Sequence, residues 1–206
     1  MLEIIAAATS TRLTTVDAVR ADCGITLDQA SDSDVERWID QQSAAIVGWL
    51  GRPLALETVR ETLLERSSTD MLALARFPIV DIASLTVNGT PIDEDGYAVN
   101  RAAGLLYRRS PTRCLFWPHG ETVITYSAGY VLPGEAGRTL PHDIERATLL
   151  LIRYGWLAQS RDPSIRSETE DGVGATTWFS SLGTNSDSMP LEVQGLLSPY
   201  RSPAVG

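Results

Sequence analysis

The sequence has no long apolar run, few cysteines and no recognisable export signal. No stretch of about 18 consecutive apolar residues occurs in the 206-residue chain, so we expect a soluble protein with no membrane partner. The apolar run at residues 4–8 is too short for a signal peptide, and Glu3 precedes it where a basic segment is expected. Cys23 and Cys114 are far apart and in no metal-ligand spacing. We therefore predict buried or semi-buried free thiols and a reducing, cytoplasmic origin.

Residue types that carry catalysis are equally scarce. The chain holds two histidines and shows no nucleophile, phosphate-loop or metal signature. His119 lies in a turn-like stretch and His142 at the start of an expected helix, and both positions are typical of exposed side chains. Asp143 and Glu145 complement the positive end of that same helix, which explains both carboxylates without catalysis. The sequence predicts no enzymatic activity, cofactor or metal.

Basic residues are outnumbered by acidic ones. Lys and Arg total 17 against 26 Asp and Glu, which gives a net charge of -9. Non-specific affinity for nucleic acid comes from basic side chains that displace counterions from phosphates. We therefore expect no DNA-binding surface, although an acidic protein can let DNA pass close by without holding it.

The longest helix-forming, apolar-rich segment covers residues 141–159. At 100° per residue its apolar side chains spread around most of the circumference, and only Arg146 and Arg153 form a clearly polar stripe. Such a helix is normally surrounded by protein, and a chain of this length has few other helices to surround it. Neighbouring copies of the chain and a monomeric core are the two ways to cover it.

Two further helices and a β unit precede this segment. Capping residues predict helices at about 14–23 and 33–50, the second opening with a capping box at Ser33, and Gly51 marks its end. From residue 56 the apolar period changes to two, and Asn88-Gly89 between short apolar runs predicts a two-residue hairpin turn. Further strands are expected at 97–100, 105–108 and 122–126, all within a mostly antiparallel β unit at about 56–128.

The apolar periodicity ends after residue 159. Residues 160–188 are rich in Ser, Thr, Gly and Asp, a composition that cannot bury enough surface to fold alone. An apolar, proline-bounded segment follows near the C-terminus, in the order expected of a tethered docking peptide. We therefore predict an α+β fold, with a small helical bundle, an inserted antiparallel β unit and an extended C-terminal arm. Residues 1–159 form the core and residues 160–206 form the linker and arm.

The order of these elements resembles the head–tail connector, or adaptor, proteins of long-tailed bacteriophages and gene-transfer particles. Two helices, a β insertion and a long apolar helix follow one another across residues 14–159. The matching landmarks are Trp49-Leu50-Gly51-Arg52-Pro53-Leu54 after the second helix, Thr125-Tyr126-Ser127-Ala128-Gly129-Tyr130 at the end of a strand, and Pro141 at the start of the long helix. The three landmarks, taken together and in this order, carry the resemblance.

The resemblance implies a virion structural protein at the neck of the particle, made in the host cytoplasm. It implies a dodecameric ring under the portal protein, with a tail or stopper protein below and DNA passing through the channel without specific binding. It also implies helix contacts between adjacent subunits, for which Arg146, Arg153 and Trp156 are the candidates. The acidic cluster of Glu168, Glu170 and Asp171 is the candidate for the channel wall.

In such rings the C-terminal segment reaches the portal. The candidate residues of this portal-docking arm are Pro190, Leu191, Val193, Leu196, Leu197, Pro199, Tyr200 and Arg201. Deleting residues 190–206 is therefore expected to leave a folded protein that cannot join portal-bearing heads.

Three alternatives stay open from the sequence. A stopper or a tail-terminator protein would occupy the same neck, but both are usually β-dominated and lack so long an apolar helix. A small hydrolase using His119 with Asp95 or Glu121 is the alternative from another class of protein.

Overall fold

The computed structural model describes residues 1–110, 113–158, 167–170, 174–177 and 189–201. The chain forms two compact units, each assembled from separate stretches of sequence. A β unit comprises residues 1–11 and 52–139, and a helical unit comprises residues 12–51 and 140–206. The predicted α+β class is confirmed, and the β unit is indeed inserted between the second and third helices of the helical unit.

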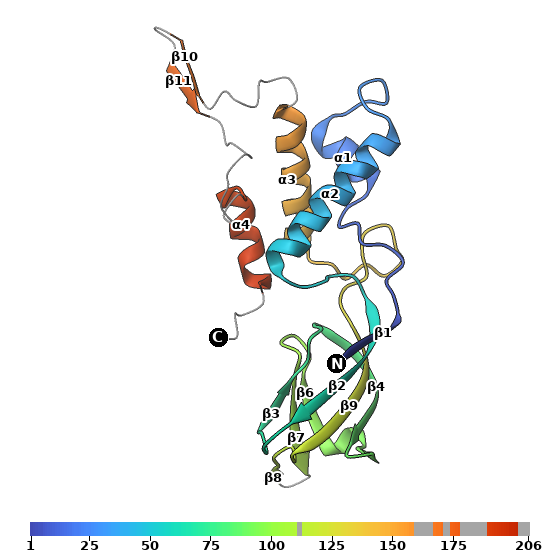
Figure 1. Cartoon of the computed structure of the whole chain (residues 1–206). Coiled ribbons are helices and arrows are strands. Elements are labelled where there is room, and N and C mark those ends of the chain that lie inside the picture. Colours follow the sequence, from blue (N-terminus) through green and yellow to red (C-terminus); the bar gives the residue numbers. More distant parts are fainter. Residues whose placement is uncertain (111–112, 159–166, 171–173, 178–188, 202–206) are drawn as a thin grey trace. The chain divides into compact units, whose positions relative to one another are not determined.

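Two antiparallel sheets build the β unit (Figure 1). The larger has the strand order β1 (Leu2–Ala6), β2 (Glu57–Glu65), β9 (Gly120–Ala128), β4 (Ile79–Val87) and β5 (Thr90–Pro91). The smaller has the order β3 (Met71–Ala73), β7 (Leu105–Ser110) and β6 (Tyr97–Asn100), and β8 (Arg113–Cys114) pairs with β7. A short 3-10 helix, η1 (Glu94–Gly96), leads into β6.

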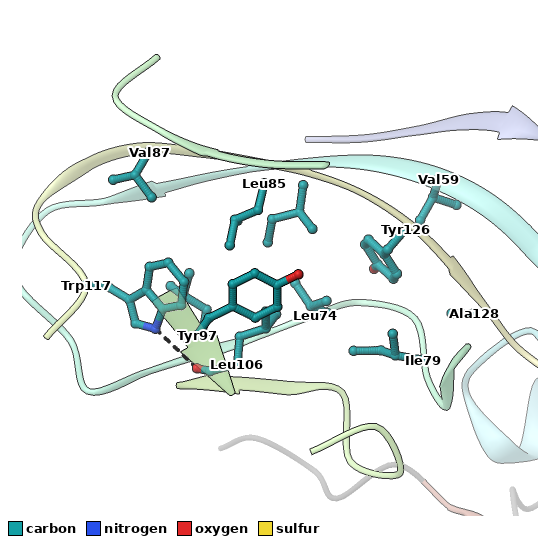
Figure 2. Close-up of a cluster of buried hydrophobic side chains, with 12 residues drawn as sticks. Val59, Leu74, Ile79, Leu85, Val87, Tyr97, Leu106, Trp117, Tyr126 and Ala128 are labelled. Carbon is teal, nitrogen blue, oxygen red and sulfur yellow. Dashed lines mark hydrogen bonds between the residues drawn. The ribbon is translucent and has the colours of Figure 1, made fainter. Parts of the chain in front are cut away.

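The core of the β unit contains side chains from both sheets (Figure 2). Val59, Ile124 and Tyr126 come from the larger sheet and are fully buried with Leu106 of the smaller one. Trp117, also fully buried, donates its indole N–H to the carbonyl of Leu106 at 3.2 Å, so its one polar atom is satisfied. The core therefore ties the two sheets together.

A buried polar cluster fixes the loop after β3. The Tyr126 hydroxyl donates to Glu61 Oε2 at 2.6 Å, and the same oxygen accepts the backbone N–H of Ala75 at 3.0 Å. Burial, reinforced by the carboxylate of Glu61, raises the pKa of Tyr126 far above its usual value, so the phenol remains a neutral donor. Satisfied buried polar groups of this kind hold one loop conformation, because releasing either partner would leave the other unpaired.

The helical unit contains α1 (Val16–Cys23), α2 (Asp32–Leu50), α3 (His142–Ala158) and α4 (Leu191–Leu197), followed by the 3-10 turn η2 (Ser198–Tyr200). Thr15 caps α1 by accepting the backbone N–H of Ala18, and Gly24 and Gly51 end the first two helices in the left-handed conformation. Between α3 and α4 the backbone forms a hairpin of β10 (Ser167–Glu170) and β11 (Gly174–Thr177).

Three local findings refine the sequence predictions. The capping box of α2 lies at Ser31 and Asp34, not at Ser33, because Ser31 accepts the Asp34 backbone N–H and so starts the helix earlier. The Asn88-Gly89 turn is confirmed, with positive φ at both residues. The sequence predicts no strand before residue 56, whereas the N-terminal residues form β1, which extends the larger sheet by pairing with β2.

Candidate interaction surfaces

Helix α3 has one apolar face against α1 and α2. Ile152 is buried, and Leu149 and Trp156 pack beside it in a cluster with Val19, Val35 and Ile39 of the first two helices. The rings of Trp156 and Trp38 lie 5.6 Å apart between centroids and are tilted to each other, an arrangement that stabilises aromatic pairs. Positions 149, 152 and 156 recur at helical spacing, so they form a single stripe.

A second stripe of α3 faces the C-terminal segment. The Tyr154 hydroxyl donates to Glu192 Oε2 at 2.7 Å, and the Tyr200 hydroxyl donates to Asp143 Oδ2 at 3.2 Å. Asp143 lies about three turns before Tyr154 on α3. Their partners follow the reverse order in the sequence, because Tyr200, which bonds to Asp143, comes after Glu192, which bonds to Tyr154. The C-terminal segment therefore runs antiparallel to α3.

The α4 seat is the surface of α3 and α2 that receives this segment, namely Asp143, Ala147, Leu150 and Tyr154 of α3 with Trp49 of α2. Ala147 and Leu150 fall between Asp143 and Tyr154 at helical spacing, and both are buried. At the far end, the guanidinium of Arg201 lies 5.0 Å from the centroid of the Trp49 ring. The seat is thus apolar along its middle and polar at its ends.

Helix α4 presents two different faces. Val193 and Leu197, four residues apart, are fully buried, and Met189 just before the helix is also buried. Leu191 is 85% exposed, Leu196 is half-buried and Pro199 is exposed. The buried face anchors the segment. Leu191 and Leu196 of α4 and Pro199 of η2, together called the outer face of α4 here, remain available to a partner.

Polar contacts at the rim of the seat contribute little to its stability. The hydrogen bond to Glu192 raises the pKa of Tyr154 above its usual value, so Tyr154 is a neutral donor at physiological pH. Both side chains are exposed, and an exposed polar contact adds little to stability. Burial of Val193 and Leu197 is therefore the main contribution to docking of the segment.

The residues predicted for subunit contacts have different surroundings. Arg146 donates to Asp22 of α1 at 2.8 Å, and Trp156 packs on Trp38, so both have partners in their own chain. Arg153 is exposed near the end of α3, as is Leu157, which is 56% exposed. Arg146 is exposed as well, so both arginines are accessible to another subunit, whereas Trp156 is half-buried.

The predicted channel acids fall in and beside the β10–β11 hairpin. The backbone of Glu168 pairs with Thr176 and that of Glu170 pairs with Gly174, and only the backbone is described at these positions. Asp171 lies outside the described residues.

The helical character of the C-terminal segment is the feature that sequence reasoning missed. Val193 and Leu197 at a four-residue spacing after Pro190 were a signal for a short amphipathic helix with one buried face. The whole predicted arm from Pro190 to Arg201 lies in α4, η2 and their immediate flanks.

Among the described residues, both histidines lie at exposed positions. His119 is exposed, and its backbone carbonyl accepts the side-chain amide of Asn88 at 3.2 Å. In the part of the chain that the structure describes, no three His, Cys, Asp or Glu side chains come close enough to hold a metal ion. Cys23 and Cys114 are free thiols, as predicted; Cys23 is half-buried, whereas Cys114 is exposed and not buried as expected. Among the described helices none is long and apolar enough to span a membrane.

Comparison with known proteins finds a matching family and several similar solved structures. The family model described as "Head completion protein" matches residues 12–202. A chain in the neck of an empty gene transfer agent (GTA) particle, computed with C6 symmetry, is 21% identical, with a TM-score of 0.58. Chains in the virion of a native GTA particle and in the neck of a native GTA particle, computed with C12 symmetry, are each 20% identical, with TM-scores of 0.59 and 0.57.

Each of these three matches covers 100% of the present chain and 97% of the other. The shared fold therefore includes both units and not the β unit alone. No curated protein matches the sequence.

The α4 seat generates a first prediction. Leu197→Ala removes a fully buried side chain, a change that typically costs about 2–5 kcal/mol when the site cannot collapse. The segment should then leave the seat more often, and amide hydrogen exchange over residues 191–197 should accelerate at least about tenfold. The matched control is Leu196→Ala on the outer face, for which little change is expected. Equal exchange in Leu197→Ala and the parent protein would show that the seat does not hold the segment.

Proposed function

The chain belongs to the head completion protein family, and from that premise we propose that it is an adaptor subunit in the neck of a virus-like particle, between portal and tail. The observation that carries the proposal is the fold shared over the full chain with neck chains of GTA particles.

We further propose that twelve copies form a ring through which DNA passes. The matched necks were computed with C6 and C12 symmetry, and both symmetries are compatible with twelve subunits. Arg153 and Leu157 at the exposed end of α3 are suited to the contact with the next subunit, with Trp156 and Arg146 supporting them from within the helical unit.

An adaptor suits the helical unit better than a stopper or a tail terminator does. Those two classes are expected to be β-dominated, whereas this chain devotes one compact unit to helices, including the 19-residue α2 and the 17-residue α3. The choice of adaptor over the other two is our inference from this helical unit.

The portal contact is proposed to use the outer face of α4. Within the predicted arm, Val193 and Leu197 are already buried on the chain's own seat, which leaves Leu191, Leu196 and Pro199 for a partner. An apolar surface of this size binds weakly on its own. Twelve such surfaces on one ring would act together at high effective concentration, and the joint would become stable.

The DNA channel is proposed to be lined by the acids of the β10–β11 region, Glu168, Glu170 and Asp171. The net charge of -9 supports this assignment, because negative or neutral walls repel phosphates and let DNA slide.

The docking proposal is tested by Leu191→Asp. Because Leu191 is 85% exposed, the substitution should leave the fold intact. Losing about 1.5–3 kcal/mol of apolar burial per subunit should reduce co-sedimentation with portal-bearing heads at least about tenfold. A point change is sharper than deleting residues 190–206, which also uncovers the α4 seat. The matched control is Leu27→Asp, a change of another exposed leucine in the helical unit. Normal co-sedimentation of Leu191→Asp would rule out the outer face as the portal contact.

The channel proposal is tested by reversing three charges. Glu168→Lys, Glu170→Lys and Asp171→Lys together should attract the DNA backbone and impair retention or ejection of DNA. A control protein with lysine at the exposed positions Asp28, Asp70 and Glu135 changes the net charge equally. DNA delivery that is normal in the first protein would remove the three acids from this role.

A further inference from the structure

We propose that the C-terminal segment of each subunit, residues 189–201, occupies the α4 seat of a neighbouring subunit in the assembled ring. The inference rests on the proposed ring and adds the surface that links its members. The occupant is a second copy of this chain. Its Glu192, Tyr200 and Arg201 would meet Tyr154, Asp143 and Trp49 of the seat, and its Val193 and Leu197 would be buried there.

The length of the connection is the first argument. Residues 159–188 separate the end of α3 from Met189, although Tyr154 and Glu192 are in direct contact. Two antiparallel helices of one chain are usually joined by about 2–8 residues, and connections longer than about 12–15 residues commonly serve a function. Docking onto the chain's own α3 does not require a connection of this length.

The reach of the connection is the second argument. The ends of the β10–β11 hairpin are adjacent, because Ser167 pairs with Thr177. The hairpin therefore adds little to the span, and residues 159–166 and 178–188 supply the rest. At about 3.3 Å per residue these 19 residues reach on the order of 60 Å. A compact unit of about 100 residues has a radius of gyration of about 13 Å, so the helical unit is about 35 Å across and the segment can reach the corresponding seat on the next subunit.

The chemistry of the seat is the third argument. All copies are identical, so every hydrogen bond and apolar contact made within a chain can be made equally well between chains. A seven-residue helix has almost no stability in isolation, so α4 needs a seat but gains nothing from that seat being its own. In a closed ring each seat is filled and each segment is used, and every exchange adds a link to the ring.

The exchange also fits the proposed portal contact. The buried face of α4 would hold the neighbouring subunit, whereas Leu191, Leu196 and Pro199 would still face outward. One short segment would thereby tie two subunits together and present the docking surface at their junction.

Thiol cross-linking in mixed rings tests the exchange. The chain contains no lysine, so amine reagents would reach only its N-terminus. In a Cys23→Ala, Cys114→Ser background, one preparation carries Tyr154→Cys and a second carries Glu192→Cys. The two are mixed, assembled with portal, imaged, and treated with a short bis-maleimide. These positions lie at the exposed rim, so the contacts of Val193 and Leu197 are retained.

The exchange predicts covalent dimers in the mixed rings, and a ladder of higher species when both substitutions are in one chain. The opposite result is a mixed ring without dimers, together with cross-links only inside each chain when one chain carries both substitutions. If the rings form normally, this result would overturn the exchange and leave the proposed function standing. Absence of any ring under the portal would overturn both.

A fixed pair within the helical unit serves as the control. Asp22→Cys with Arg146→Cys joins α1 to α3, so it should link only within a chain and give no dimers in mixed rings. A second test pair, Asp143→Cys with Tyr200→Cys, probes the opposite end of the seat and should repeat the dimer pattern. Dimers from the Asp22 and Arg146 pair at the same yield as from the test pairs would indicate random collision and overturn the exchange.

Discussion

Burial of helix α3 on two sides is the constraint on which the helical unit depends. Leu149, Ile152 and Trp156 need one apolar partner, and Ala147 with Leu150 need another. Helices α1 and α2 supply the first, and α4 supplies the second across the stripe between Asp143 and Tyr154. An apolar stripe left open to water would favour association with any available surface. The cover provided by α4 therefore determines which surfaces of the chain are accessible to partners.

Helix α4, which covers the second stripe of α3, differs from the other helices in how it is attached to the chain. It is a seven-residue helix at the end of a long connection, and its two buried side chains hold it in a seat whose polar contacts are exposed and weak. An element of this kind can be part of the core and still be exchanged or recruited by a partner. The portal contact and the exchange between subunits depend on this property. The β unit, tied together by Trp117, Tyr126 and Glu61, forms a separate core.

Features governed by neighbouring residues were predictable from the sequence. The glycine ends of α1 and α2, the Asn88-Gly89 turn and the strands before and after it follow from local backbone preferences. The family resemblance is confirmed by the match over residues 12–202, and with it the structural, non-enzymatic role. Features that depend on distant partners were not predictable in this way. β1 exists because β2 offers it an edge, Arg146 meets Asp22 only in the folded unit, and α4 is stable only on its seat.

The central claim is that this chain assembles as an adaptor on the portal. Electron microscopy of the purified protein mixed with purified portal tests it most directly. The account predicts a ring of twelve subunits stacked coaxially on one end of the portal, with the helical units in contact around the circumference. A protein that remains monomeric and ignores the portal would contradict the account, as would a ring that forms but attaches only to isolated tails.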